Sequence, residues 1–145
     1  MKFTTRTEYG LVCLAYMARN HSGRCVTLKD IAGREQFSPA YIEKILQKLK
    51  VAGIVSSHQG KDGGYLLAKK PSEITLKQII EALEGRTFDI YCEPDIRQGI
   101  VCNHFGMCGV SPIWYKTKQM LDKFYDSVTL EALSDNDPEP RALVA

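Results

Sequence analysis

Three of the five cysteines have a spacing that could hold a metal centre. Cys92, Cys102 and Cys108 form a Cys-x9-Cys-x5-Cys array. Zinc sites usually carry closely paired cysteines, and this array has no such pair. Widely spaced thiolates suit an iron–sulfur cluster, because a cluster contains several metal atoms and accepts ligands from divergent directions. A zinc site, a thiol redox switch and an array without metal are the alternatives that the spacing leaves open.

Three thiolates leave one coordination position of a cluster for a different ligand. An exchangeable ligand makes a cluster more labile, which is useful for sensing. The other two cysteines, Cys13 and Cys25, lie in the first half of the chain, and we expect Cys13 to be a small core residue. An odd number of cysteines without a secretory signal argues against a disulfide framework and for reduced thiols.

The charge is divided unevenly along the chain. Residues 1–70 hold twelve Lys and Arg against five Asp and Glu, a net charge of +7, whereas residues 71–145 hold seven against twelve, a net charge of −5. A basic half attached to an acidic half indicates that the first half meets a polyanion. No apolar run approaches the roughly 18 residues of a membrane span, and the N-terminus lacks the plan of a signal peptide. We therefore expect a cytoplasmic protein with no membrane partner.

The first half of the chain predicts three helices. Residues 9–18 are apolar almost all round, which is typical of a helix buried on more than one side. A capping box at Thr27 predicts a second helix through about residue 35. Ser38-Pro39 then begins a third helix, whose apolar side chains fall on one face.

A hairpin is expected to follow these helices. Residues 54–58 and 65–69 are strand-like, and the turn between them is rich in glycine. A capping box at Thr75 then begins a helix that ends at Gly85. Two helices in tandem followed by a hairpin with a basic tip predict a winged helix-turn-helix.

The third helix and the hairpin tip carry the candidate DNA contacts. A recognition helix presents a few side chains to base edges and phosphates in the major groove, where Gln pairs with adenine and Lys with guanine or phosphate. The candidates are Ser38, Tyr41, Lys44, Gln47 and Lys48 on the helix and His58, Gln59 and Lys61 on the wing. A solvated helix face with an ordinary hairpin is the alternative interpretation.

A long amphipathic helix is expected at the end of the chain. It begins at Ser111-Pro112 and carries a stripe near heptad spacing, formed by Ile113, Thr117, Met120, Leu121, Phe124 and Val128. A helix of this kind after a long loop needs a partner surface, and a second copy of the chain is the simplest one. The sequence therefore predicts a homodimer.

From Met1 to about Ser134, the chain resembles the IscR/NsrR-type (Rrf-two) family of bacterial winged-helix regulators. The most specific stretches are Ser38-Pro-Ala-Tyr-Ile-Glu-Lys-Ile-Leu, Gly60-Lys-Asp-Gly-Gly-Tyr-Leu-Leu-Ala and Ile74-Thr through Ala82-Leu-Glu-Gly85. The three cysteines after that glycine complete the pattern. The resemblance implies a homodimer on a palindromic operator in double-stranded DNA, with a 2Fe–2S or 4Fe–4S cluster as the sensor.

The resemblance also implies ligands for that cluster. Cys92, Cys102 and Cys108 stand where the family has its cluster cysteines, although the first spacing is longer than in IscR. IscR-like members use a His three residues after the last cysteine, where this chain has Ser111, and His104 is a substitute. NsrR-like members take a carboxylate from the first helix of the other subunit, which corresponds to Glu8. Glu8 acting in trans is the favoured fourth ligand.

The expected fold is mainly α with a small β-hairpin wing, a winged helix-turn-helix with a long C-terminal dimerisation helix. We divide the chain into a DNA-binding domain, residues 1–85, a cysteine-bearing cluster loop, 86–110, a dimerisation helix, 111–134, and a disordered tail, 135–145. The expected function is that of a transcription regulator, a repressor, whose cluster senses nitric oxide, redox state, iron or cluster supply.

Three alternatives belong beside this prediction. The first is a cluster-free, CymR-like regulator controlled by a partner protein. The second is a thiol redox protein, but no Cys-x2-Cys motif, nucleotide loop or acid/base pair supports an enzyme. The third is a nucleic-acid-binding module without a regulatory role, which binding to a palindrome with cluster-dependent affinity would distinguish.

Overall fold

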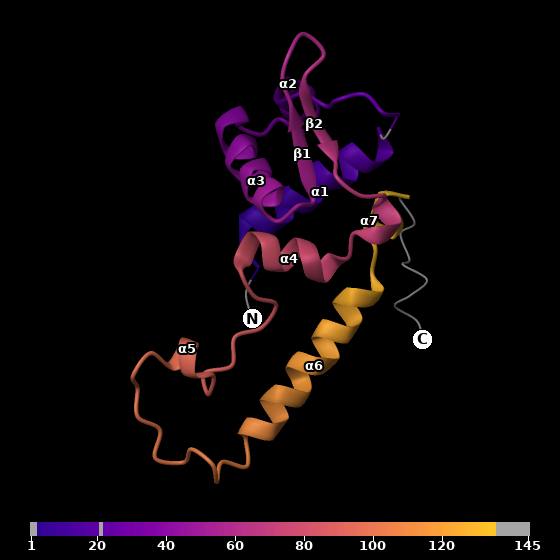
Figure 1. Cartoon of the computed structure of the whole chain (residues 1–145). Helices are drawn as coiled ribbons and strands as arrows, with labels where there is room; N and C mark the ends of the chain where they lie inside the picture. Colours follow the sequence, from indigo (N-terminus) through magenta and orange to yellow (C-terminus); the bar gives the residue numbers. More distant parts are fainter. Residues whose placement is uncertain (1–2, 21, 136–145) are drawn as a thin grey trace.

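The computed structural model describes residues 3–20 and 22–135, which form a helical head, a hairpin and a projecting helix (Figure 1). The elements are α1 (Thr5–Arg19), α2 (Leu28–Glu35), α3 (Pro39–Val51), β1 (Val55–His58), β2 (Gly64–Leu67), η1 (Pro71–Glu73), α4 (Leu76–Glu84), α5 (Pro94–Arg97), α6 (Ser111–Ser127) and α7 (Leu130–Ser134). The order of helices and hairpin confirms the predicted fold class.

Helix α1 is the centre of the core. Cys13, Leu14 and Met17 are buried, and the helix packs against α3, α4, β2 and α7. Burial on several sides is what its nearly continuous apolar sequence predicts. Gly10 lies where α1 crosses α4, and a Cβ at this position would overlap the Leu83 side chain. The close crossing therefore requires glycine.

Local sequence signals set the starts of the helices around this core. The capping boxes at Thr27 and Thr75 are both formed: each side chain accepts a hydrogen bond from the backbone of the third helical residue. Helix α3 begins at Pro39, after Ser38, whose side chain makes no capping hydrogen bond. The buried side chains of α3 are Ile42, Ile45, Leu46 and Leu49.

The wing is formed by the antiparallel strands β1 and β2, in which Val55 lies opposite Leu67 and His58 lies opposite Gly64. Val26, between α1 and α2, exchanges two backbone hydrogen bonds with Tyr65, with N–O distances of 2.9 and 2.8 Å. Gly64 has a φ of +148°, and a Cβ there would lie 2.6 Å from the carbonyl oxygen of Val26. The wing is thus fastened to the segment between α1 and α2 at the turn end of β2.

The end of α6 returns the chain to the head. The amide of Leu76 donates to the carbonyl of Val128, and the amide of Leu130 donates to the carbonyl of Ile74, both at 2.8 Å. Ile74, Val128 and Leu130 are buried. This seam fixes the direction in which α6 leaves the head, so α6 and the cysteine segment extend away from the hairpin (Figure 1).

Two segments differ from the expected elements. Residues 111–134, expected as one helix, form α6 and α7, because Val128 takes an extended backbone in the seam and Thr129 caps a new helix. The segment 86–110, expected as a loop, contains the short helix α5. Of the expected tail, 136–145 lies outside the described residues. Within residues 3–20 and 22–135, no helix is long and apolar enough to cross a membrane.

The N-terminus of α1 is tied to the C-terminus of α4 by Glu84. Its carboxylate accepts hydrogen bonds from Thr4 and, at 2.6 Å, from Thr7, and Arg6 lies 3.9 Å away. Burial alone would raise the pKa of Glu84, but the two hydroxyl hydrogen bonds and the nearby guanidinium outweigh it and lower that pKa. The carboxylate form of Glu84 is therefore more stable in the folded chain than in the unfolded chain.

Because the folded pKa lies below the ordinary value of 4.5, the stabilisation from Glu84 is present above that pH and is lost as the pH falls through the folded pKa. We expect Glu84→Gln to lower the free energy of unfolding by about 1 kcal/mol at pH 7. In urea unfolding at a fixed chain concentration, this difference from the native chain should shrink as the pH falls towards 3. Glu81→Gln, at an exposed position of the same helix, is the control; a pH-independent cost of Glu84→Gln would contradict the assignment.

Candidate nucleic-acid interface and metal centre

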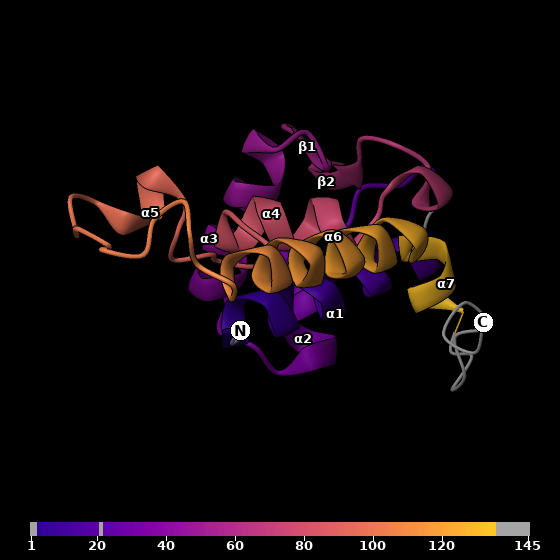
Figure 2. The same cartoon turned by 90° about the horizontal axis from the view of Figure 1, so that it is seen from below.

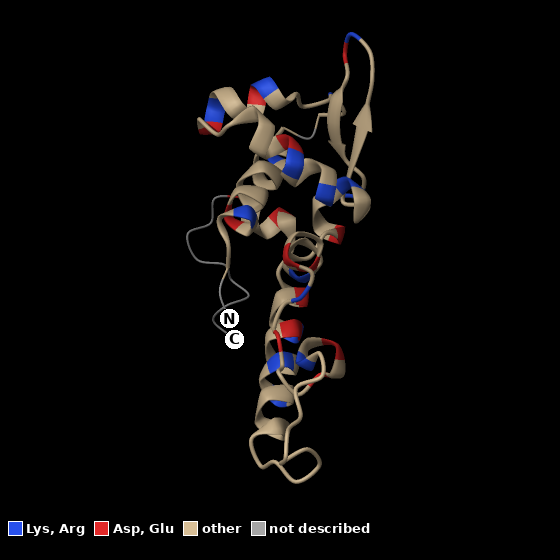
Figure 3. Cartoon of the chain, turned by 90° about the vertical axis from the view of Figure 1, so that its left-hand side faces the viewer, with Lys and Arg blue, Asp and Glu red and all other residues tan. Residues whose placement is uncertain are grey.

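The outer face of α3 presents the predicted DNA contacts to solvent. Because its inner side chains are buried, the side chains on the opposite face point outwards. Ser38, Lys44, Gln47 and Lys48 are exposed. The helix carries three exposed lysines, Lys44, Lys48 and Lys50, against one exposed Glu43. The ribbon is also coloured for a basic residue at the tip of the hairpin in Figure 3, so helix and wing together form a basic end of the head.

Tyr41 differs from the other candidates on α3 because it is half-buried. Its ring packs edge-on against Tyr9, with ring centroids 5.5 Å apart, and its hydroxyl lies 3.4 Å from Oγ1 of Thr5. Tyr9 in turn stacks on Phe37, with centroids 4.0 Å apart. Tyr41 therefore joins the start of α1 to the recognition helix, a role that the spacing of α3 alone did not indicate.

The wing places its three candidates at the end of a tight turn. His58, Gln59 and Lys61 are all exposed. The turn is closed by the amide of Gly63 donating to the carbonyl of Gly60 at 3.1 Å, and Nε2 of His58 lies 3.2 Å from Oγ of Ser56. The tip is thus free to approach a phosphate backbone or an adjoining groove.

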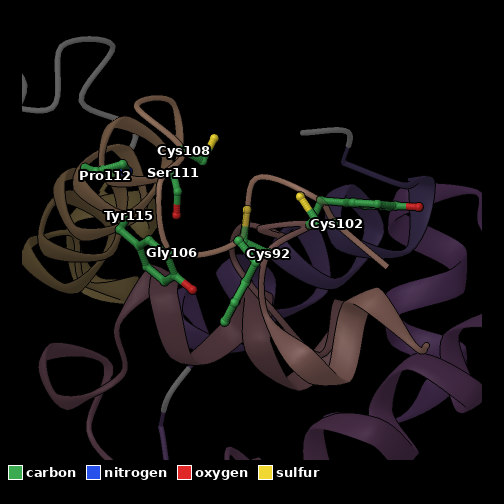
Figure 4. Close-up of a pocket in the computed structure, with 9 residues that line it drawn as sticks. Cys92, Cys102, Gly106, Cys108, Ser111, Pro112 and Tyr115 are labelled. Carbon is green, nitrogen blue, oxygen red and sulfur yellow. The ribbon is translucent and has the colours of Figure 1, made fainter. Parts of the chain in front are cut away.

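The three cysteines of the array line one pocket at the far end of the molecule. The cavity has a volume of about 350 Å³. In Figure 4, Cys92 and Cys102 lie near each other, while Cys108 lies beside Ser111, where α6 begins. The remaining walls are aromatic or small and are formed by Tyr91, Phe105, Gly106, Pro112 and Tyr115.

The thiols share this pocket without converging on one point. Among the described residues, no three Cys, His, Asp or Glu side chains are close enough together to hold a metal ion. Cys102 is exposed, and Cys92 and Cys108 are half-buried. His104 is exposed and does not line the pocket, and Glu8 is exposed in the first turn of α1. A single chain therefore supplies the three thiols but does not bring Glu8 to them.

The remaining cysteines lie in the head and have free thiols. Cys13 is fully buried, and burial, reinforced by the charge of Glu35, raises the pKa of its thiol to about 12. This confirms the expected core role, since a thiol of that pKa stays protonated at neutral pH. Cys25 is half-buried and lines a pocket with Lys61, Asp62 and Gly63 of the hairpin turn.

The polar anchor between the cysteine segment and α6 was missed from the sequence. Arg86 contacts Asp89, Glu93 and Asp95. Lys118 of α6 reaches the same Glu93, with Nζ 3.4 Å from Oε1. The three acidic neighbours of Arg86 were the one available signal, but Lys118 is 25 residues from Glu93, and no local pattern joins them.

The apolar side of α6 is uncovered in the single chain. Ile113 and Trp114, near the helix start, and Met120, near its middle, are 59%, 45% and 65% exposed. Tyr125, near the end of the helix, is buried. Val128, expected on the stripe, is buried in the seam with the head instead. In Figure 2, α6 runs across the view in front of the head, and its side towards the viewer is uncovered.

Comparison with known proteins gives matches along nearly the whole described chain. The family model Rrf2, described as an iron-dependent transcriptional regulator, matches residues 3–136. Protein rrf2 of Nitratidesulfovibrio vulgaris is 32% identical over 92% of this chain and 87% of that protein. The structure of CymR (YrzC), the global cysteine regulator of B. subtilis, is 29% identical with a TM-score of 0.74, covering 92% of this chain and 96% of that one.

The structure of T. potens IscR is 31% identical with a TM-score of 0.69, covering 93% of this chain and 88% of that one. The family match therefore includes the helix-turn-helix, the wing, the cysteine segment and the long helix. The family consists of transcriptional regulators and not of enzymes, which decides against the enzyme alternative. The chain belongs to the Rrf2 family of DNA-binding transcriptional regulators.

Proposed function

We propose that this regulator is a homodimer that binds a palindromic operator and whose affinity for DNA is set by an iron–sulfur cluster on the cysteine segment. The observation that carries the proposal is the placing of Cys92, Cys102 and Cys108 around one pocket at the start of α6. The site lies at the opposite end of the chain from the wing (Figure 1). Such a regulator acts where the chromosome is, in the cytoplasm.

The donor set of this pocket fits a cluster. All three cysteines are free thiols and at least partly exposed, so they are available as ligands. Residues 98–115 contain no Lys, Arg, Asp or Glu, and aromatic side chains form part of the pocket wall; an apolar lining of this kind affects the properties of such centres. A 2Fe–2S or 4Fe–4S cluster held here would supply a redox-active centre sensitive to loss of one ligand.

A homodimer would complete both ends of the molecule. The exposed side of α6 carries large apolar side chains, and contiguous apolar surface of this kind marks an interaction site. Pairing α6 with its copy would cover that side and set two heads side by side. Two recognition helices related by a twofold axis match the symmetry of a palindromic operator.

The same dimer gives Glu8 its role as the fourth ligand. In one chain, Glu8 belongs to the head and the cysteines belong to the projecting end (Figure 1). A second chain, paired along α6, is needed to supply its Glu8 to the three thiols of the first. The cluster would then join the head of one subunit to the cysteine segment of the other. Loss of the cluster would therefore allow the two heads to change their relative orientation. His104, outside the pocket lining, is the weaker candidate.

A cluster-free regulator controlled by a partner protein is the second candidate function. It is favoured by the similarity to CymR of B. subtilis, with a TM-score of 0.74 over 92% of this chain. In that case the head and the recognition face would act as proposed, and the cysteine segment would have no metal. The two functions make opposite predictions for the colour of the purified protein.

For the DNA contacts, we expect Lys44→Ala and Gln47→Ala to weaken binding to an operator selected from random-sequence DNA. A lost base contact from Gln47 should cost about 1–3 kcal/mol and relax the preference at one position, whereas a lost phosphate contact from Lys44 should weaken binding uniformly and reduce the salt slope by about 1. The measurement is a band-shift titration at several salt concentrations. Lys123→Ala removes an equal charge from α6 and is the control. Unchanged affinity in both test variants would refute the recognition face.

For the cluster, we expect protein purified without oxygen to be brown, with stoichiometric iron and sulfide. Cys102→Ala should remove the visible absorption, because it deletes one ligand of the pocket. Cys25→Ala, which changes a cysteine of the head, should leave the absorption intact. A native chain that stays colourless after reconstitution with iron and sulfide would reject the cluster and favour the partner-controlled regulator.

For the fourth ligand, Glu8→Ala should change the absorption spectrum, while His104→Ala should not. The trans arrangement has a sharper test in mixed dimers. A Glu8→Ala chain paired with a Cys102→Ala chain contains one complete site, formed by the cysteines of the first chain and Glu8 of the second. Isolated mixed dimers should show the native spectrum at about half of its intensity; if Glu8 acted within its own chain, they would show only the altered spectrum of Glu8→Ala.

A further inference from the structure

The cysteine segment consists of an anchored part and a loosely held part, and Cys92 belongs to the anchored one. Ile90 is buried, and its carbonyl accepts a hydrogen bond from the amide of Glu93 at 2.9 Å. Cys92 lies inside the turn that this bond closes. Both ends of the turn are therefore fixed to other parts of the chain, Ile90 by burial and Glu93 by its side chain.

The Glu93 carboxylate is held from two directions. Its Oε2 lies 3.2 Å from Nη1 of Arg86, and its Oε1 lies 3.4 Å from Nζ of Lys118. Lys118 also donates to the carbonyl of Phe88 at 3.5 Å, so one ammonium group binds both sides of the turn. One helical turn further along α6, Asp122 accepts a hydrogen bond from the buried Thr87.

The part after Arg97 is joined to α5 by one ring contact, in which the Arg97 guanidinium lies 4.7 Å from the centroid of the exposed Phe105 ring, and no ion pair holds residues 98–115. Residues 98–115 carry no charged side chain, which Figure 3 shows as an uncoloured tip below α5. The backbone hydrogen bonds around Cys102 are short-range, such as that from the amide of Phe105 to the carbonyl of Cys102 at 3.2 Å. The side chains of this part are mostly exposed, among them Val101 at 84% and Met107 at 89%.

We propose that Glu93 is a positioning residue for the cysteine site: by joining Arg86 to Lys118 of α6, its carboxylate holds the Cys92 turn in place, so that this thiol is positioned before Cys102 and Cys108 are gathered. The inference rests on the proposed function for the purpose of the site, but the positioning itself is a property of the metal-free chain. It assigns different mobility to three thiols that the sequence pattern treats alike.

The contacts of Glu93 with Arg86 and Lys118 are sheltered enough from solvent to stabilise the Cys92 turn. Isolated surface ion pairs contribute little, but a carboxylate shared by two cations is a network, and the Glu93 side chain is only 18% exposed. Removing Lys118 leaves a largely covered carboxylate with one partner fewer and frees the carbonyl of Phe88. The expected consequence is local opening of the turn while the head stays folded.

The test is the alkylation rate of each cysteine in the full-length, reduced, metal-free chain. The probe is iodoacetamide, with the sites resolved by mass spectrometry. Lys118→Met should speed alkylation of Cys92 by about threefold to tenfold, because local opening exposes the thiol. Cys102 and Cys108 serve as internal references and should keep their rates. Lys123→Met, one turn beyond on the exposed surface of α6, is the matched control and should change none of the three.

The direction of the change separates positioning from a simple charge effect. Losing a nearby cation disfavours the thiolate and, acting alone, slows alkylation. Faster labelling of Cys92 in Lys118→Met therefore indicates opening of the turn. Glu93→Gln should also speed labelling, and the double variant should gain little more, because both substitutions break one contact. An unchanged or slower rate at Cys92 in Lys118→Met, or equal acceleration of all three cysteines, would overturn the proposal.

The outcome does not depend on the cluster. If the native chain binds no cluster, the proposed function fails while the alkylation rates still decide the role of Glu93. If the chain is brown and Cys92 responds as expected, a second readout applies: a chelator should remove iron from Lys118→Met faster than from Lys123→Met. Equal rates of iron loss would contradict the idea that the anchored thiol contributes to holding the site together.

Discussion

Two backbone hydrogen bonds, from Leu76 to Val128 and from Leu130 to Ile74, decide how the projecting end of the chain is joined to the head. They form where Ile74, Val128 and Leu130 are buried, so competing water is excluded. The direction of α6 follows from this seam, and so does the place of the cysteine segment at its far end. The exposed apolar side of α6 follows as well, because the head covers the helix from the other side.

This arrangement places the two candidate sites far apart within one chain. Helix α3 and the wing lie at one end, and the cysteine pocket lies at the other (Figure 1). A signal that acts only on the pocket has a long path to α3 through a single chain. Pairing along α6 offers a shorter one, since it brings the pocket of each subunit towards the head of the other. The homodimer and the trans ligand are in this sense one proposal, derived from a single geometric constraint.

Under the proposed function, the cysteine segment would meet two requirements of a labile centre. One thiol must be in place for assembly to begin, and the others must be able to move when a ligand is lost. The contacts of Glu93 with Arg86 and Lys118 serve the first requirement, because they hold the turn that contains Cys92. The uncharged, exposed stretch around Cys102 serves the second, because it makes few contacts beyond its own turns.

The sequence by itself determined the features that depend on near neighbours. The capping boxes at Thr27 and Thr75, the buried face of α3 and the hairpin are set by residues within a few positions of one another, and the structure has them as predicted. The break at Val128 was decided by an isolated bridge to the segment 74–76, about fifty residues away, and a heptad pattern cannot record that contact.

Contacts between residues far apart in the sequence also limit how much of the candidate site the sequence could predict. Residue types and spacing were enough to select the three cysteines and the outer face of α3. Only the tertiary structure placed Lys118 against Glu93 and Tyr41 against Tyr9, because packing and charge pairing across the fold act between residues that no periodicity connects.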